Sequence, residues 1–359
     1  MIPHSRPTLG AEEKEAVLAV LESGQIAQGK KVMEFEKAFC ALTGRRYAVA
    51  VSSGSSALHL SFLALGISEG DEVIVPSYTC VALLHAIQSV GAHPVVADID
   101  LGDFNISVSS VKKKIRRKTK ALVVPHSFGL PAPVDTLQAF GIPVIEDATQ
   151  ALGAHVNGKP VGSFGVISLF SFYATKMITS GEGGMALTDF PRLAEKLHDL
   201  RDYDKKETYR FRTNSKMTDL EAAMGLVQIK KLPQFLKRRR ELALQYKEAL
   251  GSSGVLPPAE ASGRDHVFYR YVVRVPKRKK EFMRQLLSQG IEVKEPVFKP
   301  LHHYLDLADS KFPFTRQAVK ESCSLPIYPS LADGECSQIF RALRAEWPSC
   351  ASEEAKVLT

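Results

Sequence analysis

The sequence predicts an α/β protein with a mainly parallel central sheet and a smaller αβ domain towards its C-terminal end. Short, continuous apolar runs alternate with helical patterns up to about residue 187. Turn residues border these runs, which is typical of strands that are buried on both faces of a parallel sheet. The 359 residues also exceed the usual length of one domain, so we expect two domains, residues 1–235 and 236–359.

The expected elements of the first domain follow one another in regular alternation. Amphipathic spacing predicts helices over residues 12–24 and 32–42, ahead of the first strand. Two apolar patterns, 57–65 and 81–90, predict helices between strands. The expected strands are 47–51, 72–75, 94–97, 121–124, 142–145, 166–172 and 185–187.

The pattern changes near residue 219. Two helical patterns, 219–229 and 234–250, meet at Pro233, and we expect a break there because proline lacks a backbone donor. A β-rich run over 268–275 and a helical pattern over 280–289 then predict a small second αβ unit. The last residues, 349–359, are expected to be frayed.

Composition excludes several classes of protein. No apolar run approaches the roughly 18–20 residues of a membrane span, and the first residues lack the apolar core of a signal peptide, so we expect a cytoplasmic protein. Five cysteines without a CxxC pair argue against a disulfide framework or structural zinc. The net charge of +8 attracts anions, but the basic runs lack interleaved aromatic residues, so no nucleic-acid partner is expected.

Three expected strands end in residues that suit a ligand, at the edge where open parallel sheets bind one. Ser52–Ser56 joins a strand to a helix, and backbone amides, hydroxyls and the helix dipole can bind a phosphate there. Asp147 ends a second strand, where a carboxylate can also simply cap a helix. Lys176 follows a third strand among hydrophobic and small residues, and desolvation would make its amine a useful nucleophile.

Each of these residues has an ordinary structural explanation when it is considered alone. Together they form a phosphate cradle, an acid able to pair with a pyridinium nitrogen, and an amine nucleophile. These are the protein groups that pyridoxal 5'-phosphate (PLP) requires. We therefore expect a PLP enzyme.

The sequence also resembles the sugar aminotransferases of the DegT/DnrJ/EryC1/StrS family, which are PLP enzymes of fold type I. The similarity extends from about Pro7 to about Leu331. Eight ordered segments carry it: Glu34–Phe39, Ser53–Leu60, Gly70–Thr79, Ile145–Gly153, Ser171–Lys176, Gly181–Met185, Asn214–Gly225 and Leu325–Pro329.

The resemblance implies a role for each matching residue. Lys176 would bond covalently to the cofactor and move the proton between substrate carbon and cofactor, while Asp147 would keep the ring nitrogen protonated. Gln150 would contact the ring. The phosphate would be bound by Gly54, Ser55, Ser56 and Ser171. Asn214 would reach the phosphate of the neighbouring subunit, which implies a homodimer with shared active sites.

The family's usual reaction moves an amino group from glutamate to a keto-sugar, often linked to a nucleotide, in amino-sugar biosynthesis. Some relatives act on cyclitols or make aromatic amino acids. Others are dehydratases with histidine in place of the lysine, and Lys176 argues against that activity here. A non-catalytic protein with the same fold is a further alternative, which the intact set of cofactor residues makes improbable.

Several positions depart from the family pattern or leave alternatives open. Cys80 stands where many members place an aromatic residue against the cofactor ring. The segment His302, His303 and Tyr304 resembles a loop that faces the substrate. Metal binding is not expected, because neither histidine has a third ligand at a suitable spacing. His126 ends a strand, where it could contact cofactor or substrate indirectly or serve the fold alone.

Overall fold

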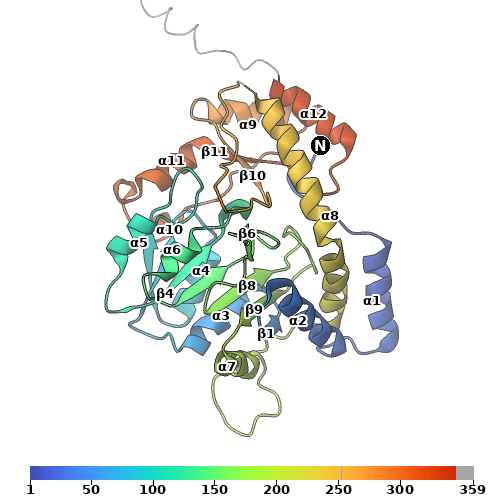
Figure 1. Cartoon of the computed structure of the whole chain (residues 1–359), viewed down its shortest axis with the longest axis vertical. Helices are drawn as coiled ribbons and strands as arrows, with labels where there is room; N and C mark the ends of the chain where they lie inside the picture. The colour runs from blue at the N-terminus through green and yellow to red at the C-terminus, as the bar shows by residue number, and fades with distance from the viewer. Residues whose placement is uncertain (252, 345–359) are drawn as a thin grey trace, which may run out of the picture.

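A seven-stranded sheet forms the centre of the computed structural model, which describes residues 1–251 and 253–344 (Figure 1). The strand order is β1-β9-β8-β5-β4-β2-β3. Within this described sheet, β9 is antiparallel to both neighbours and the other pairings are parallel, which confirms the mainly parallel prediction. The strands are β1 (Tyr47–Val51), β2 (Glu72–Pro76), β3 (His93–Ala97), β4 (Thr119–Pro125), β5 (Val144–Asp147), β8 (Ile167–Ser171) and β9 (Gly184–Thr188).

Helices cover both faces of the sheet. Alternate side chains of each strand enter different hydrophobic cores: in β1, Ala48 and Ala50 face one core, while Val49 and Val51 face the other. The first core also receives side chains of α2 (Lys30–Thr43), α5 (Val108–Lys114), α6 (Val134–Gln138) and α8 (Asp219–Leu250), and the second those of α3 (Gly54–Leu65), α4 (Ala82–Ser89) and α7 (Pro191–Arg201). This three-layer packing explains the continuous apolar runs in the sequence.

The long helix α8 corrects the expected break at Pro233. It continues from residue 219 to 250 without interruption and is the yellow diagonal helix of Figure 1. Pro233 is exposed, whereas Leu232 and Phe235 beside it are buried in the first core. Burial of each side chain contributes about 1.5–3 kcal/mol, which offsets the roughly 3 kcal/mol that an interior proline costs.

A smaller unit lies at the upper end of α8 (Figure 1). Its core contains Leu242 and Tyr246 of α8 and side chains of the antiparallel pair β10–β11. The remaining elements are α1 (Ala11–Ser23), η1 (Ser127–Gly129), β6 (His155–Val156), β7 (Lys159–Pro160), β10 (Tyr271–Arg274), α9 (Lys279–Ser288), α10 (Leu301–Tyr304), η2 (Asp309–Lys311), α11 (Pro313–Glu321), β11 (Ser322–Leu325) and α12 (Asp333–Arg344).

We propose that the two domains meet within α8, just after residue 235, because Phe235 packs in the first core and Leu242 in the core of the smaller unit. A segment from each side crosses this boundary. Ile2 forms a β-bridge with Ile291 of the smaller unit, and Tyr269 packs into the first core. The expected frayed segment 349–359 lies outside the described residues. Among the residues that are described, no helix is long and apolar enough to cross a membrane.

Candidate active site

The carboxyl ends of five strands meet at one edge of the sheet, because β1, β2, β4, β5 and β8 all point in the same direction. This edge is where open parallel sheets hold their ligands. The structure brings the predicted cofactor residues to it from four strands: Gly54, Ser55 and Ser56 follow β1, Cys80 follows β2, Asp147 and Gln150 end and follow β5, and Ser171 and Lys176 end and follow β8.

The segment after β1 forms the start of helix α3. Ser53 caps the helix, and its Oγ accepts a hydrogen bond from the amide of Ser56 at 3.0 Å. Hydroxyl contacts join Ser56 Oγ to Ser52 Oγ and Ser53 Oγ at 3.1 and 2.9 Å. The first amides of a helix lack partners within it and carry the positive end of its dipole. The segment therefore offers amides and hydroxyls to an anion.

Glycines allow this segment to approach the neighbouring strands. A Cβ at Gly54 would lie 2.9 Å from Cβ of Ser171, closer than side chains pack. A Cβ at Gly184, which begins β9, would lie 2.3 Å from the carbonyl oxygen of Ser53. Only glycine permits both approaches, and the hydroxyl of Ser171 consequently lies beside the helix start. This arrangement fits a phosphate.

Asp147 is the last residue of β5 and is 8% exposed. Its Oδ1 accepts a hydrogen bond from the amide of Thr149 at 3.1 Å. A carboxylate has about four acceptor sites, so this contact, the one recorded for the side chain among the described residues, leaves most of its capacity for another donor. An N–H of a ligand ring would use that capacity.

The side chain of Gln150 is oriented by a backbone contact. Its Oε1 accepts from the amide of Phe128 at 2.9 Å, which leaves the NH₂ group as the free donor. Phe128 has φ 57°, an unusual conformation for a bulky residue. The nearby His126 is fully buried, with Nε2 3.0 Å from Glu146 and Nδ1 accepting from the amide of Ala132. Of the two alternatives for His126, the structure therefore favours the one that serves the fold.

Lys176 is half-buried, and its Nζ lies 5.2 Å from the centroid of the Tyr269 ring. The Tyr269 hydroxyl lies 3.4 Å from Thr175 Oγ1. Burial opposes ionisation of this phenol, but the charges of Lys176 and Arg270 and the contact with Thr175 outweigh it and lower its pKa from 10.0 to about 8. We did not identify Tyr269 from the sequence, where nothing connects a residue just before β10 with Lys176.

A shallow pocket beside Lys176 is lined by Thr175, Tyr269, Arg270, His4 and Ser5, among others. Within the described residues, Arg270 forms no ion pair with a carboxylate, so its charge is available to an anionic ligand. The pocket thus places the Arg270 cation beside Tyr269, whose ring lies next to Lys176.

Glu146, next to Asp147 on β5, is fully buried and belongs to the scaffold of the site. Its carboxylate accepts hydrogen bonds from the amides of Gly162, Phe164 and Gly165, from the Ser168 hydroxyl and from His126. Burial raises the pKa of Glu146, but these donors lower it by more than burial raises it. The pKa therefore falls from 4.5 to about 2. The carboxylate is saturated by the protein itself.

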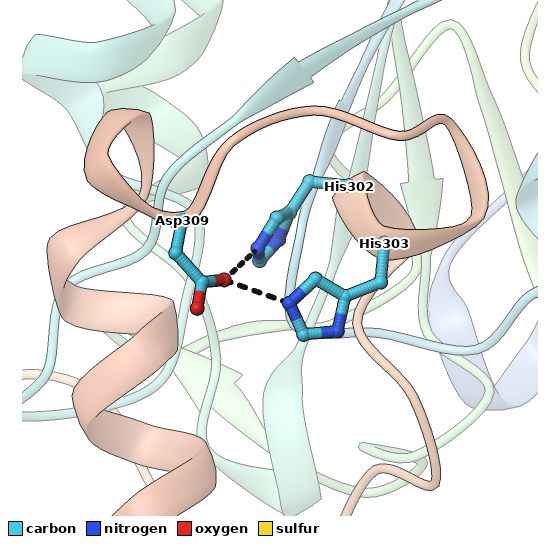
Figure 2. Close-up of side chains that lie close together, drawn as sticks. All are labelled: His302, His303 and Asp309. Carbon is cyan, nitrogen blue, oxygen red and sulfur yellow. Dashed lines mark hydrogen bonds and ion pairs between the residues drawn. The ribbon is translucent and has the colours of Figure 1, made fainter.

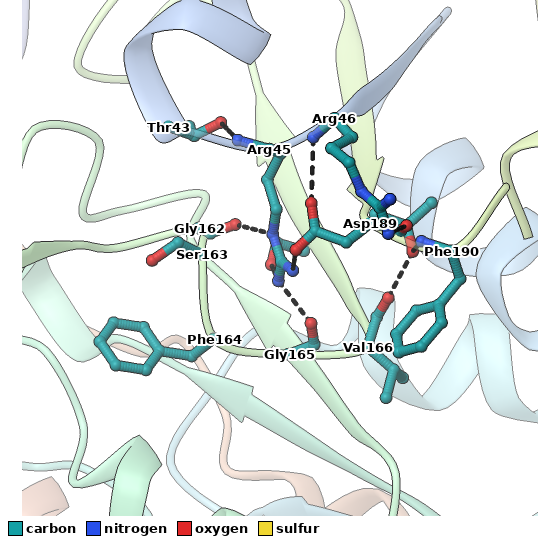
Figure 3. Close-up of polar contacts among 12 residues, drawn as sticks. Thr43, Arg45, Arg46, Gly162, Ser163, Phe164, Gly165, Val166, Asp189 and Phe190 are labelled. Atoms are coloured by element: carbon teal, nitrogen blue, oxygen red, sulfur yellow. Dashed lines mark hydrogen bonds and ion pairs between the residues drawn. The ribbon is translucent and has the colours of Figure 1, made fainter.

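The other side of the same loop is held by Arg45, as Figure 3 shows. Arg45 donates to the carbonyl oxygens of Gly162 and Gly165 and to Ser168 Oγ, and forms an ion pair with Asp189 at 2.7 Å. The anionic Glu146 thus accepts hydrogen bonds from the amides of the loop, and the cationic Arg45 donates to its carbonyl oxygens. This pairing fixes the loop between β5 and β8, the two strands that carry Asp147 and Lys176.

A comparison with known protein families matches residues 7–344 to the DegT/DnrJ/EryC1/StrS aminotransferase family. The chain belongs to this family. As predicted, it is a PLP-dependent aminotransferase of fold type I.

Solved structures agree with this family over almost the whole chain. The aminotransferase TlmJ from Streptoalloteichus hindustanus has 31% sequence identity and a TM-score of 0.89, over 96% of this chain and 98% of that one. Spr1654 from Streptococcus pneumoniae, solved in PLP and PMP forms, has 27% identity and a TM-score of 0.89, over 96% of this chain and 96–97% of that one. The sugar aminotransferase CalS13 from Micromonospora echinospora has 26% identity and a TM-score of 0.87, over 97% of this chain and all of that one.

Two predicted residues of the aminotransferase lie exposed at the surface. Cys80 follows β2 at the carboxyl edge of the sheet. Asn214 precedes Ser215, whose carbonyl oxygen accepts from the amide of Ser52 at 2.9 Å. Asn214 is therefore attached to the segment that leads into the phosphate cradle of its own chain, with its side chain free to face outward.

The three residues of the loop expected to face the substrate differ in exposure. His302 is fully buried, and its ring nitrogens contact Ser77 Oγ at 2.5 Å and Asp309 Oδ1 at 2.9 Å. Both ring nitrogens of His302 thus contact groups of the fold in this structure, and its contact with a substrate stays a prediction. Tyr304 is exposed, with Lys299 Nζ 4.5 Å from its ring centroid, and His303 is half-buried.

Proposed function

We propose that this aminotransferase transfers the amino group of glutamate to a keto-sugar, most suitably one linked to a nucleotide, in two successive half-reactions on the same cofactor. The observation that carries the proposal is the convergence of Lys176, Asp147 and the Gly54–Ser56 cradle on one sheet edge. Family membership supports the reaction class, and the sugar aminotransferase CalS13 supports the sugar.

Bound PLP would supply an aldehyde that takes the amine and a ring that takes up electrons from the substrate carbon. Lys176 would hold the cofactor covalently and then carry the proton to and from that carbon. Asp147, with its unused acceptor capacity, would accept the N–H of the ring and keep that nitrogen protonated. Gln150 would donate its free NH₂ group to the ring hydroxyl.

The phosphate of the cofactor would be held by the amides and hydroxyls of Gly54, Ser55 and Ser56 together with Ser171. Cys80 would lie against the ring in place of the aromatic residue common in the family. A thiol covers less of a ring than an aromatic side chain does, so this position contributes little stacking.

Arg270 and Tyr269 favour an anionic substrate beside Lys176. The guanidinium has no carboxylate partner in the described chain, and it lies in the same pocket as Thr175 and Tyr269. A carboxylate of glutamate, or a diphosphate of a nucleotide sugar, would complete its pairing. The excess of basic residues, +8 overall, attracts either anion.

Stepwise spectroscopy of the purified PLP-loaded protein tests this function. Glutamate alone should replace the visible absorbance of bound PLP with that of pyridoxamine phosphate, and a nucleotide keto-sugar should then restore it. A non-catalytic protein would show neither change. A cyclitol ketone that restores the absorbance where every keto-sugar fails would assign the acceptor to the other substrate class.

We further propose a homodimer in which Asn214 serves the phosphate of the partner's cofactor. The exposed position of Asn214 next to its own cradle segment supports this, since two cradles near a twofold axis could exchange such residues. Subunit mixing tests it with two inactive variants, Lys176→Ala and Asn214→Asp, the latter repelling the phosphate. Sharing leaves one intact site in each mixed dimer, so activity should return. If Asn214 serves its own chain, every site carries a lesion and none returns.

A further inference from the structure

A cluster of three metal-ligand side chains lies on the segment from α10 to η2. His302, His303 and Asp309 each present one ligand atom, and these atoms lie within 4.8 Å of one another. Figure 2 shows both imidazole rings directed at the same carboxylate. Nε2 of His302 and Nε2 of His303 lie 2.9 and 2.7 Å from Asp309 Oδ1.

The sequence did not suggest this cluster, because neither histidine has a third ligand at a regular spacing. The fold provides one. The chain turns back after α10, with the amides of Leu305 and Leu307 both donating to the carbonyl oxygen of His302, and this turn brings Asp309 to the histidines. The third candidate ligand is therefore supplied by the fold and not by a regular spacing in the sequence.

His302 is oriented as a metal ligand requires. Its Nδ1 is 2.5 Å from Ser77 Oγ, so that nitrogen is held by a hydrogen bond while Nε2 faces the cluster. Histidine ligands of metals usually donate a hydrogen bond from their second ring nitrogen, so on metal binding Nδ1 of His302 would carry the proton and donate it to Ser77 Oγ. The ring also stacks on Phe312, with centroids 4.3 Å apart and planes inclined by 18°.

The other two groups leave access for an ion. The side chain of His303 is 36% exposed and that of Asp309 is 46% exposed, so a hydrated cation can reach the cluster and displace the present hydrogen bonds. The negative charge of the buried Asp98 also acts on His302 and would favour a cation there. His303 and His302 are both directed at the same oxygen of Asp309.

We propose that His302, His303 and Asp309 bind a divalent transition-metal ion. Two imidazole nitrogens and one carboxylate oxygen match the ligands of zinc, with water as the fourth ligand. The bound ion would link α10 to η2. Because the amide of Leu301 donates to the carbonyl oxygen of Ser77 at 2.8 Å, the bound ion would also restrict the motion of the segment between β2 and Cys80. This site is independent of the proposed amino donor and acceptor.

Zinc binding to the untagged protein tests the proposal without any measurement of catalysis. Equilibrium dialysis against zinc chloride at micromolar concentration should load the wild type with one equivalent more than His303→Ala or Asp309→Asn. Affinity should fall by at least the roughly 10–100-fold that loss of an outer partner causes. His93→Ala, which removes an exposed histidine elsewhere, should bind as the wild type does.

Comparison between variants cancels any zinc held by the exposed thiol of Cys80. Asp309→Asn retains an oxygen that accepts from both histidines, so the turn should stay folded. X-ray absorption of the zinc-loaded wild type gives a second readout that needs no variant. Two imidazoles and an oxygen ligand support the site. Equal zinc binding by all variants, no binding by the wild type, or an absorption spectrum without imidazole ligands would each overturn it.

Discussion

Two neighbouring carboxylates on β5 have opposite environments. Glu146 accepts hydrogen bonds from three amides, a hydroxyl and a histidine, and is fully buried. Among the described residues, Asp147 accepts one local bond, from the amide of Thr149, and it lies at the carboxyl edge of the sheet. This difference distinguishes a structural carboxylate from a ligand-binding one. A carboxylate whose acceptor sites are all used by the protein holds the loop in place, whereas one with unused acceptor sites can bind a ligand.

The largest effect on the active site is expected from a change at Lys176. Lys176→Ala should lower turnover by about 10⁴-fold or more, because both the covalent attachment and the proton carrier are lost. The protein should still fold and bind PLP non-covalently. Reduction of wild type with borohydride, followed by peptide mapping, should find the cofactor on Lys176. Lys120→Ala, an exposed control, should keep full activity, and a label on another lysine would refute the assignment.

Asp147→Asn tests the role of Asp147 as a ligand-binding carboxylate, because it removes the charge of the side chain and keeps its shape. Both half-reactions should slow by about 10²–10³-fold, the usual effect of losing one electrostatic contribution. The free energy of unfolding should change by less than about 1 kcal/mol, because the present contact of Asp147 is local. Rapid-mixing spectroscopy and urea unfolding measure the two effects. Rates near those of the wild type would contradict the role of Asp147.

Glu146→Gln should give the converse result. Loss of the charge weakens hydrogen bonds from buried donors and should lower the free energy of unfolding by about 2–3 kcal/mol. Any remaining activity should be limited by folding rather than by chemistry. Urea unfolding at neutral pH, beside Asp147→Asn as the matched control, separates the two carboxylates. A stable and inactive Glu146→Gln protein would reverse the assignment of scaffold and site.

Glu146 also predicts a dependence of stability on pH. Its pKa falls from 4.5 to about 2 on folding, so its contribution is fully present above pH 4.5 and is lost as the pH falls towards 2. The loss from this group amounts to about 3 kcal/mol. Unfolding free energies measured across this range should show a shallower decline for Glu146→Gln than for the wild type. Parallel curves would contradict the lowered pKa.

The smallest effect is expected at Tyr269. Tyr269→Phe keeps the ring beside Lys176 and removes the hydroxyl, so turnover should fall by about tenfold, at the low end of proton-transfer effects. In the cofactor-free protein, the difference spectrum between wild type and this variant should show a phenol that titrates near pH 8. The same titration should move upward in Lys176→Ala. Tyr173→Phe, an exposed tyrosine nearby, is the control.

Local patterns in the sequence were sufficient for the strands of the central sheet, for several of the helices and for the order of the cofactor residues. Buried strands appear as apolar runs, and parallel strands bring their carboxyl ends to one edge, so the cradle, Asp147 and Lys176 could be predicted together. The family resemblance added the roles of these residues and the reaction class. No comparable local pattern distinguishes Glu146 from Asp147.

Only the tertiary structure decided the contacts between segments that are distant along the chain. It placed Tyr269 beside Lys176, turned Asp309 back to the histidines and kept α8 continuous through Pro233. The physical reason is common to all three. Local sequence determines the conformation of each segment, whereas packing between segments determines which side chains meet and which backbone costs are offset.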